Sequence, residues 1–281
     1  MSRKFELFGS RPSESIWRYT NLAKLLNIID DNGNINLVAL RAGEFDDGYE
    51  GTFSKKAVAK LESIVKGEPI TRTVDSRGSV ARNYPDATQE YDKRIFGTEK
   101  VEKYQSGEDE LERINRRMRE ITYANCWNIG EGENSTMWFA YTKPSDGVVI
   151  KSSFDNIEGS IISANGKLIL GCVEYIDFED SNMQLSPVAP FFYKKEEFNS
   201  ESEFRFVLTD YEQEEIQPDG GIDDMPKPTD RKRSITLDAS EFIDEIRVHP
   251  TSGSHLRNVV EDIFEDSNIK VSDSSLKPNL S

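Results

Sequence analysis

The sequence is poor in the residue types that build metal centres and most hydrolytic sites. Its 281 residues include two cysteines and two histidines, which are Cys126, Cys172, His249 and His255. Zinc sites draw mainly on these residue types, and a Ser-His-Asp arrangement would depend on one of two late histidines. The composition therefore argues against a zinc enzyme and a serine hydrolase, and we expect no metal. Both cysteines lie in apolar segments, which predicts free, buried thiols.

Positive charge and long apolar runs are also scarce. The chain has 35 lysines and arginines against 51 aspartates and glutamates, a net charge of −16. Because phosphate contacts need clustered cations, this balance argues against a nucleic-acid-binding surface spread over the whole molecule, and it leaves local basic patches open. No apolar run approaches the roughly 20 residues of a membrane span, and the N-terminus lacks an apolar signal core. The sequence predicts a cytoplasmic protein with no membrane partner.

Apolar periodicity predicts one α+β domain over residues 1–281, with two packed, mainly antiparallel sheets and helices mostly in the N-terminal half. Helical patterns cover 21–29, 55–66, 107–119 and 256–264, with a helical turn at 135–141. Strand patterns cover 15–20, 35–40, 121–128, 147–152, 168–176, 188–193, 203–209, 234–237, 244–248 and 269–271.

Three segments lack this periodicity. Residues 68–106 are polar and predict an insertion or lid, 211–233 predict an exposed acidic loop, and 273–281 a flexible tail. The helix at 107–119 carries a basic patch of four arginines, Arg113, Arg116, Arg117 and Arg119. This patch is either a solvated helix face or a contact for nucleic acid.

A strand near residue 203 concentrates charge beside aromatic residues. Side chains alternate along a strand, so Glu201, Glu203 and Arg205 should share one face while Phe204 and Phe206 point to the other. Charges can protect an edge strand from unwanted pairing, which is one interpretation. The other is a pair of glutamates that hold a sugar hydroxyl and stabilise positive charge developing at an anomeric carbon.

Arg18 stands between two aromatic residues in a predicted apolar strand. A buried charge needs a partner, so Arg18 either pairs with an acidic residue such as Glu50 or Glu203 or binds an anion. A guanidinium group grips phosphate in a bidentate manner, which lysine does less well.

A second cluster, Met137, Trp138 and Tyr141, occupies neighbouring positions of the helical turn at 135–141. It predicts either a core anchor or an aromatic wall for a base or nicotinamide ring. Ser135 could bond to a ribose or an amide. The acidic segment 45–51 does not spell a regular calcium loop.

Five motifs follow one another along the chain. They are Trp17-Arg18-Tyr19-Thr20, Phe45-Asp46-Asp47-x-x-Glu50-Gly51, Cys126-Trp127-Asn128, Met137-Trp138-x-x-Tyr141 before Gly147-Val148, and Glu201-x-Glu203-x-Arg205. In this order they resemble a microbial family known as domain of unknown function 2971, over nearly the whole chain. The order is also similar to the ADP-ribosyltransferase superfamily, in which an early arginine or histidine, a central serine or aromatic motif and a late Glu-x-Glu surround NAD in a split two-sheet fold.

The second resemblance implies roles for particular residues. Arg18, with the adjacent Tyr19, would hold NAD, and Trp138 and Tyr141 would flank its nicotinamide with help from Ser135. Glu203 would be the catalytic glutamate that bonds the ribose hydroxyl and stabilises the oxocarbenium-like transition state, and Glu201 would orient the acceptor.

By analogy with relatives, the protein would be a toxin or phage-defence effector, with a cognate antitoxin or regulatory protein as a partner. The acceptor would be a nucleic acid or a protein. The alternative is a non-catalytic binding module in which Arg18 and Glu203 form a structural ion pair.

Overall fold

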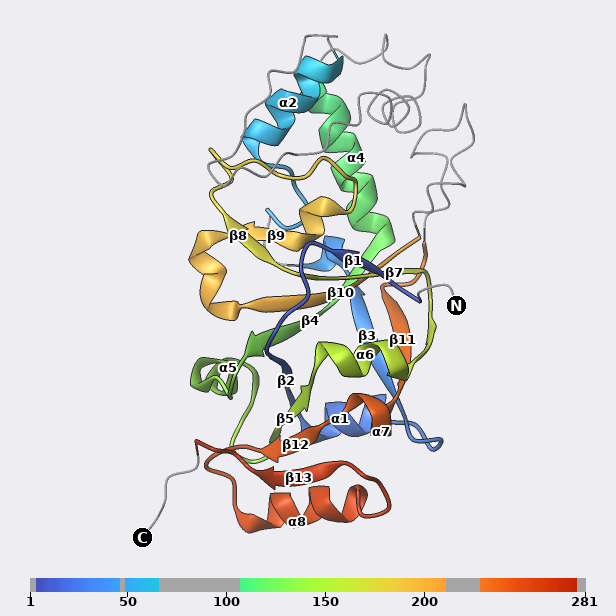
Figure 1. The fold of residues 1–281 in the computed structure, drawn as a ribbon, viewed down its shortest axis with the longest axis vertical. Helices are drawn as coiled ribbons and strands as arrows, with labels where there is room; N and C mark the ends of the chain where they lie inside the picture. The colour runs from blue at the N-terminus through green and yellow to red at the C-terminus, as the bar shows by residue number, and fades with distance from the viewer. Residues whose placement is uncertain (1–3, 46–48, 66–106, 211–227, 277–281) are drawn as a thin grey trace.

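A computed structural model describes residues 4–45, 49–65, 107–210 and 228–276, with the backbone alone for 61–65, 107–111 and 114. The predicted insertion or lid at 68–106, most of the acidic loop at 211–233 and the last residues of the tail lie outside this part. The elements form an elongated body, with α2 (Lys55–Val65) and α4 (Gly107–Ile121) at one end and α8 (Ser254–Ile263) at the other (Figure 1).

The fold is mixed α and β, built on one large, mainly antiparallel sheet of eleven strands. Eight strands follow one path, in the order β1 (Glu6–Phe8), β7 (Lys167–Cys172), β10 (Glu203–Thr209), β4 (Thr122–Gly130), β2 (Ser15–Asn21), β5 (Gly147–Ser152), β12 (Glu245–Val248) and β13 (Lys270–Asp273). The other three are β3 (Asn34–Arg41), β11 (Lys232–Asp238) and β6 (Ile161–Ala164).

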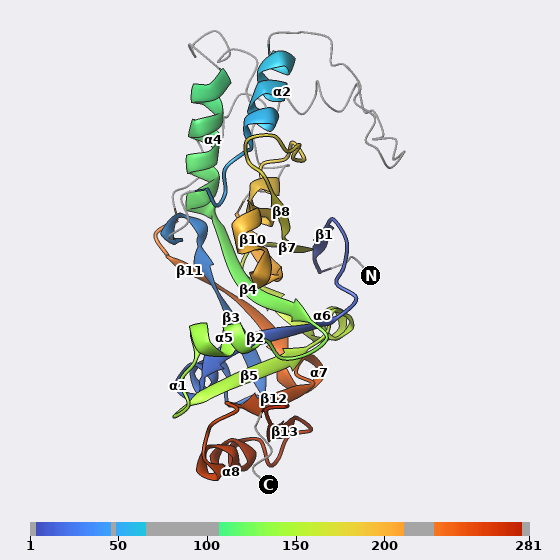
Figure 2. The ribbon, with the colours of Figure 1, turned by 90° about the vertical axis from the view of Figure 1, so that its left-hand side faces the viewer.

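The sheet forks at β4. One edge of β4 pairs with β10 over residues 122–128. The other edge pairs with β2 at one end, where Trp17 faces Asn128, and with β3 at the other end, where Leu40 faces Ala124. Two wings leave this fork, β2-β5-β12-β13 and β3-β11-β6, and their strands run in different directions (Figure 2).

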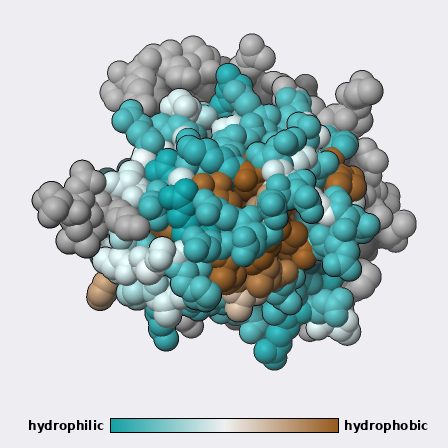
Figure 3. Space-filling view, turned by 90° about the horizontal axis from the view of Figure 1, so that it is seen from below, coloured by the Kyte–Doolittle hydropathy of each residue, from teal (hydrophilic) through white to brown (hydrophobic). Residues whose placement is uncertain are grey.

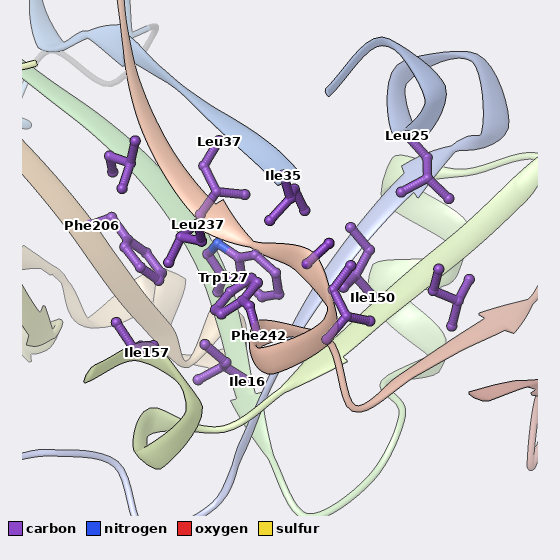
Figure 4. Close-up of a cluster of buried hydrophobic side chains, with 14 of the residues drawn as sticks. Ile16, Leu25, Ile35, Leu37, Trp127, Ile150, Ile157, Phe206, Leu237 and Phe242 are labelled. Carbon is purple, nitrogen blue, oxygen red and sulfur yellow. The ribbon is translucent and has the colours of Figure 1, made fainter. Parts of the chain in front are cut away.

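The main core fills the space between the two wings. Ile16 and Ile150 enter it from the first wing and Ile35 and Leu237 from the second, and these side chains point toward Trp127 (Figure 4). Each is almost completely buried, and full burial of a side chain of this size contributes about 1.5–3 kcal/mol. The core therefore holds the two wings together across the fork.

The sequence predicts two packed, mainly antiparallel sheets, whereas the second sheet of the structure is small. It has two parallel strands, β8 (Glu174–Ile176) and β9 (Tyr193–Lys195). The predicted strand at 188–193 is wrong, because most of it is the 3-10 helix η3 (Ala189–Phe192) with a proline near its start. A proline cannot donate to a strand ladder, which favours the short helix here.

Side-chain caps set the start of several helices. Asn21 accepts a hydrogen bond from the backbone N–H of Lys24 at 2.8 Å and begins α1 (Leu22–Ile28). Asn134 accepts from the N–H groups of Thr136 and Met137 and begins α5 (Ser135–Tyr141). Short polar side chains satisfy the unpaired donors of a first helical turn in this way. The other helical elements of the described residues are η1 (Ala42–Glu44), α6 (Phe154–Ser160), η4 (Glu196–Glu201) and α7 (Ala239–Phe242).

Two segment boundaries differ from the expectations. Residues 232 and 233 belong to β11 and not to the acidic loop. The tail was expected to be flexible from residue 273, but Asp273 ends β13, and the backbone N–H and hydroxyl of Ser275 both donate to Glu133 at 2.6 Å.

The end of the molecule that carries α8 has an apolar area near its middle within a polar surface (Figure 3). Leu26 of α1 and Ile263 of α8 are among the exposed large apolar side chains. Within the described ranges, no helix combines the length and apolar character needed to cross a membrane.

Candidate functional site

The charged face of β10 lies at the centre of the sheet. β10 is flanked by β7 and β4, and all seven of its residues are buried, so the edge-strand interpretation is wrong. Phe204 and Phe206 point into the main core as predicted. Glu203 and Arg205 share the opposite face, where the Arg205 Nε–H donates to Glu203 Oε2 at 2.8 Å. Charges that face inward from a central strand require partners of their own.

A chain of ion pairs supplies these partners. Arg205 also pairs with Glu50 and donates to the Phe191 carbonyl at 2.8 Å. The ammonium group of Lys194 donates to Glu203 Oε1 at 2.8 Å. Burial alone would raise the pKa of Glu203, but Arg205 and Lys194 more than offset this effect and hold it below its ordinary value. Glu203 is therefore an ionised carboxylate with 6% exposure.

The small sheet positions two of the groups around Glu203. Tyr175 of β8 and Lys194 of β9 are paired in register, so they lie side by side on one face. The Tyr175 hydroxyl accepts a hydrogen bond from the backbone N–H of Glu203 at 2.9 Å. The sequence interpretation missed both residues, and the one available signal was a lysine pair directly after the aromatic run 191–193.

Glu201 reaches the same lysine from a different element. It ends η4, and Lys194 donates to its Oε2 at 2.6 Å. Ser202, which follows, has φ 39° and ψ 66°, the one positive φ of a non-glycine residue in the described ranges. This left-handed residue allows Glu201 to approach Glu203 although Glu201 is not in the strand. Such strain is typical of functional sites.

The pKa of Glu201 is raised to about 7. Burial is the largest cause, followed by a hydrogen bond in which Glu201 shares its proton with Glu203, and Lys194 acts in the opposite direction. The two carboxyl groups thus differ, since Glu203 is charged while Glu201 exchanges its proton near neutral pH. Environments that move the pKa values of two neighbouring carboxyl groups apart are a common basis of acid–base chemistry.

Arg18 lies in the gap that opens between β2 and β4. Their pairing ends at Trp17, and the Arg18 guanidinium donates to the carbonyl of Cys126 on β4. Burial lowers the pKa of Arg18, and the nearby acidic groups of Cys126, Tyr141 and Glu203 oppose this effect. Among the described carboxylates, none lies within ion-pair distance of Arg18. Of the two alternatives for Arg18, the ion pair with Glu50 or Glu203 is wrong, because Arg205 and Lys194 occupy those carboxylates.

Tyr141 at the end of α5 completes the cluster. Its side chain is largely exposed, at 60%. Burial of its hydroxyl end raises the pKa, and the charges of Glu201 and Glu203 raise it further. The structure thus brings together four of the seven residues expected from the sequence, which are Arg18, Tyr141, Glu201 and Glu203.

The other three expected residues lie elsewhere around α5. Trp138 is 2% exposed, packs edge-on against Tyr19 and donates its indole N–H to Glu133 at 3.0 Å. Tyr19 is also buried, and its hydroxyl accepts from the Asn134 N–H at 2.6 Å. These two rings form a core anchor and offer no open wall to a ligand. Ser135 is exposed at the start of α5.

The arginines of α4 do not form one surface beside this cluster. Arg117 is buried and pairs with Glu120 at 2.6 Å, whereas Arg116 is exposed. α4 leads into the start of β4, while the cluster lies near Asn128 at the other end (Figure 1). Six residues of strand separate these points by about 20 Å.

Both cysteines are free thiols, as predicted, although each is half-buried. Burial is the largest cause that raises the pKa of Cys126 to about 12 and that of Cys172 to about 11. Thiols with such values are poor nucleophiles at neutral pH. Within the part of the chain that the structure covers, no three His, Cys, Asp or Glu residues are grouped so that they could hold a metal ion.

Comparison of the chain with protein-family models, with curated proteins and with solved structures found no match. The two family resemblances therefore stay predictions from the motifs, and the cluster of Arg18, Tyr141, Glu201, Glu203 and Lys194 has to be interpreted from its own chemistry.

Proposed function

We propose that this protein binds NAD and transfers its ADP-ribose group, with Glu203 as the catalytic glutamate and Arg18 as the residue that holds NAD. One observation carries the proposal. Arg18, Tyr141 and the pair of glutamates come from distant parts of the chain, yet Tyr141 and Glu203 affect the pKa of Arg18, and both glutamates affect the pKa of Tyr141. They are the residues that the motif order singled out.

The charge state of Glu203 suits this reaction. Cleavage of the bond between nicotinamide and ribose develops positive charge on the ribose, and a fixed carboxylate stabilises that charge. Arg205 and Lys194 keep Glu203 ionised and hold it in place. The reaction needs positioning and electrostatic stabilisation, which this cluster supplies without a histidine.

Arg18 suits an anionic ligand. It is a half-buried cation without a carboxylate partner in the described ranges, so a phosphate group would supply the missing countercharge. Tyr141 would offer its exposed ring to the nicotinamide, and Glu201 would orient the acceptor, a nucleic acid or a protein. Trp138 and Tyr19 would act from the core by fixing α5 against β2.

The motif resemblance to the ADP-ribosyltransferase superfamily extends the proposal to a toxin or phage-defence effector that works in the cytoplasm. A cognate antitoxin or regulatory protein would then be its partner.

A specific observation also favours a second candidate, a non-catalytic binding module. Both carboxylate oxygens of Glu203 are occupied by cations of the protein itself. In this second case the ion network is structural, although it runs through Arg205 and Lys194 and not through the expected Arg18–Glu203 pair.

Thermal unfolding with and without millimolar NAD, followed by a nicotinamide-release assay, tests the proposal. A ligand that binds the folded protein raises its Tm. Arg18→Lys keeps the charge but loses the two parallel N–H donors of the guanidinium group. We expect it to weaken NAD binding about tenfold or more. The matched control is Arg11→Lys at an exposed ion pair with Asp155.

For the chemical step we expect Glu203→Gln to reduce nicotinamide release by about 10²–10³-fold. The control is Glu197→Gln, which removes an exposed glutamate of η4. Circular dichroism spectra of both variants serve to check that they are folded. If NAD does not stabilise the wild-type protein and no nicotinamide is released in a cell extract that supplies acceptors, the proposal is wrong and the binding module is favoured.

A further inference from the structure

Lys194 occupies an unusual place between the two glutamates. Its ammonium group donates to Glu201 Oε2 at 2.6 Å and to Glu203 Oε1 at 2.8 Å, so one cation contacts both carboxyl groups. The ring of Phe198 lies 4.7 Å from the same nitrogen. The residue is nearly buried, which is costly for a lysine unless its charge is fully compensated.

The small sheet explains how Lys194 is held there. β9 pairs with β8 in parallel, and the Lys194 neighbour Tyr175 is fixed to the backbone of Glu203 by its hydroxyl. The side chain of Asn128 on β4 donates to the carbonyl of Glu201 at 2.6 Å and fixes the other carboxyl-bearing residue. Backbone contacts thus secure both glutamates, while Lys194 is the one side chain in the described part of the chain whose cation contacts both of their carboxyl groups.

We propose that Lys194 is a positioning residue that holds Glu201 beside the ionised Glu203 and so makes Glu201 the group of this site that accepts or releases a proton. The role in catalysis depends on the proposed function, but the arrangement of the two carboxyl groups can be measured without it.

The groups that face Glu201 come from four elements besides its own. They are Glu203 on β10, Lys194 on β9, and the hydroxyls of Tyr141 on α5 and Tyr175 on β8. Glu203 favours the protonated form of Glu201, and Lys194 favours the ionised form. Both tyrosines have raised pKa values and stay neutral near pH 7. Loss of the lysine charge would therefore raise the pKa of Glu201.

Carbon-13 NMR of the full chain, labelled at its glutamate carboxyl groups, tests this arrangement. The Glu201 signal is assigned by its loss in Glu201→Gln. We expect Lys194→Met to move its titration upward by about 1–3 units, the usual effect of a neighbouring opposite charge. Lys194→Arg should restore the wild-type value, because it returns the charge. Lys195→Met is the matched control, since that lysine lies over the Tyr49 ring on the same strand.

Stability alone would not distinguish the proposal from a purely structural role, but the titration does. An unchanged Glu201 titration in Lys194→Met, or an equal shift in Lys195→Met, overturns the proposal. If Lys194→Met does not fold, Lys194→Gln replaces it, because glutamine keeps a donor and removes the charge.

A nicotinamide-release assay separates this proposal from the proposed function. If the wild-type protein is active, the pH profile of kcat/KM in Lys194→Met should move in the same direction as the titration, and an unmoved profile counts against the role in catalysis. An inactive wild-type protein whose Glu201 titration still depends on Lys194 would contradict the proposed function and leave the arrangement standing.

Discussion

Glu201→Gln should make the protein more stable, and by a much larger margin at pH 8 than at pH 5. Glutamine has the shape of a protonated glutamate, so it can accept from Lys194 and donate to Glu203 as protonated Glu201 does. At pH 5 the wild-type side chain is protonated in the folded state but mostly ionised in the unfolded chain, so the exchange changes the stability by only about 1 kcal/mol. At pH 8 the wild-type side chain is ionised and the variant is not.

The magnitude follows from the two pKa values of Glu201. Its pKa is about 7 in the folded state and its ordinary value is 4.5. Between these values the folded protein binds more protons than the unfolded chain, so the free energy of unfolding falls as pH rises from about 4.5 to about 7 and is level above that. At 1.36 kcal/mol per unit, the whole fall is about 3 kcal/mol.

Urea unfolding of wild type and variant at pH 5, 6, 7 and 8 measures this difference. Glu203 keeps its charge over this range because its folded pKa lies below the ordinary value. His249, whose pKa is lowered by burial, contributes equally to both proteins and cancels. Glu197→Gln, at an exposed glutamate of η4, is the control variant. A stability difference that is the same at pH 5 and pH 8, or a variant that is less stable at pH 8, would refute the reasoning.

Two further predictions concern residues with left-handed backbone. Gly51→Ala should cost at least about 1 kcal/mol more than Gly33→Ala in urea unfolding, because both have φ +78° but only at Gly51 would a Cβ lie 2.8 Å from a Phe191 ring carbon. Equal losses would mean that the ring moves away freely. Ser202→Val should be about 1–3 kcal/mol less stable than Ser202→Gly at pH 7, because a β-branched residue does not tolerate φ 39°. Equal stability of the two variants would show that the backbone relaxes there.

Local pattern was enough to predict the charged strand. The alternation of Glu203, Phe204, Arg205 and Phe206 gave the correct faces, because period two is a property of any strand. It could not show whether that strand was central or at an edge. The charges of β10 face the small sheet and not the solvent, and that sheet is formed by residues from other parts of the chain.

The partners of the charged residues were beyond what the sequence could show. Arg18, Lys194 and Arg205 could each pair with several carboxylates, and only the three-dimensional arrangement decides among them. Trp138 and Tyr141 occupy one helical turn, yet the first is buried and the second exposed. Which side of a seven-residue helix faces the sheet depends on the strands that it packs against, here β2.

The fork at β4 also limits how the protein can be divided. Both wings hydrogen-bond to the same edge of this strand, and each covers the apolar face of the other. Removal of one wing would expose the interior of its counterpart and leave part of β4 without a neighbour. Neither wing can therefore be excised as an independent module, and together they should melt as one cooperative unit.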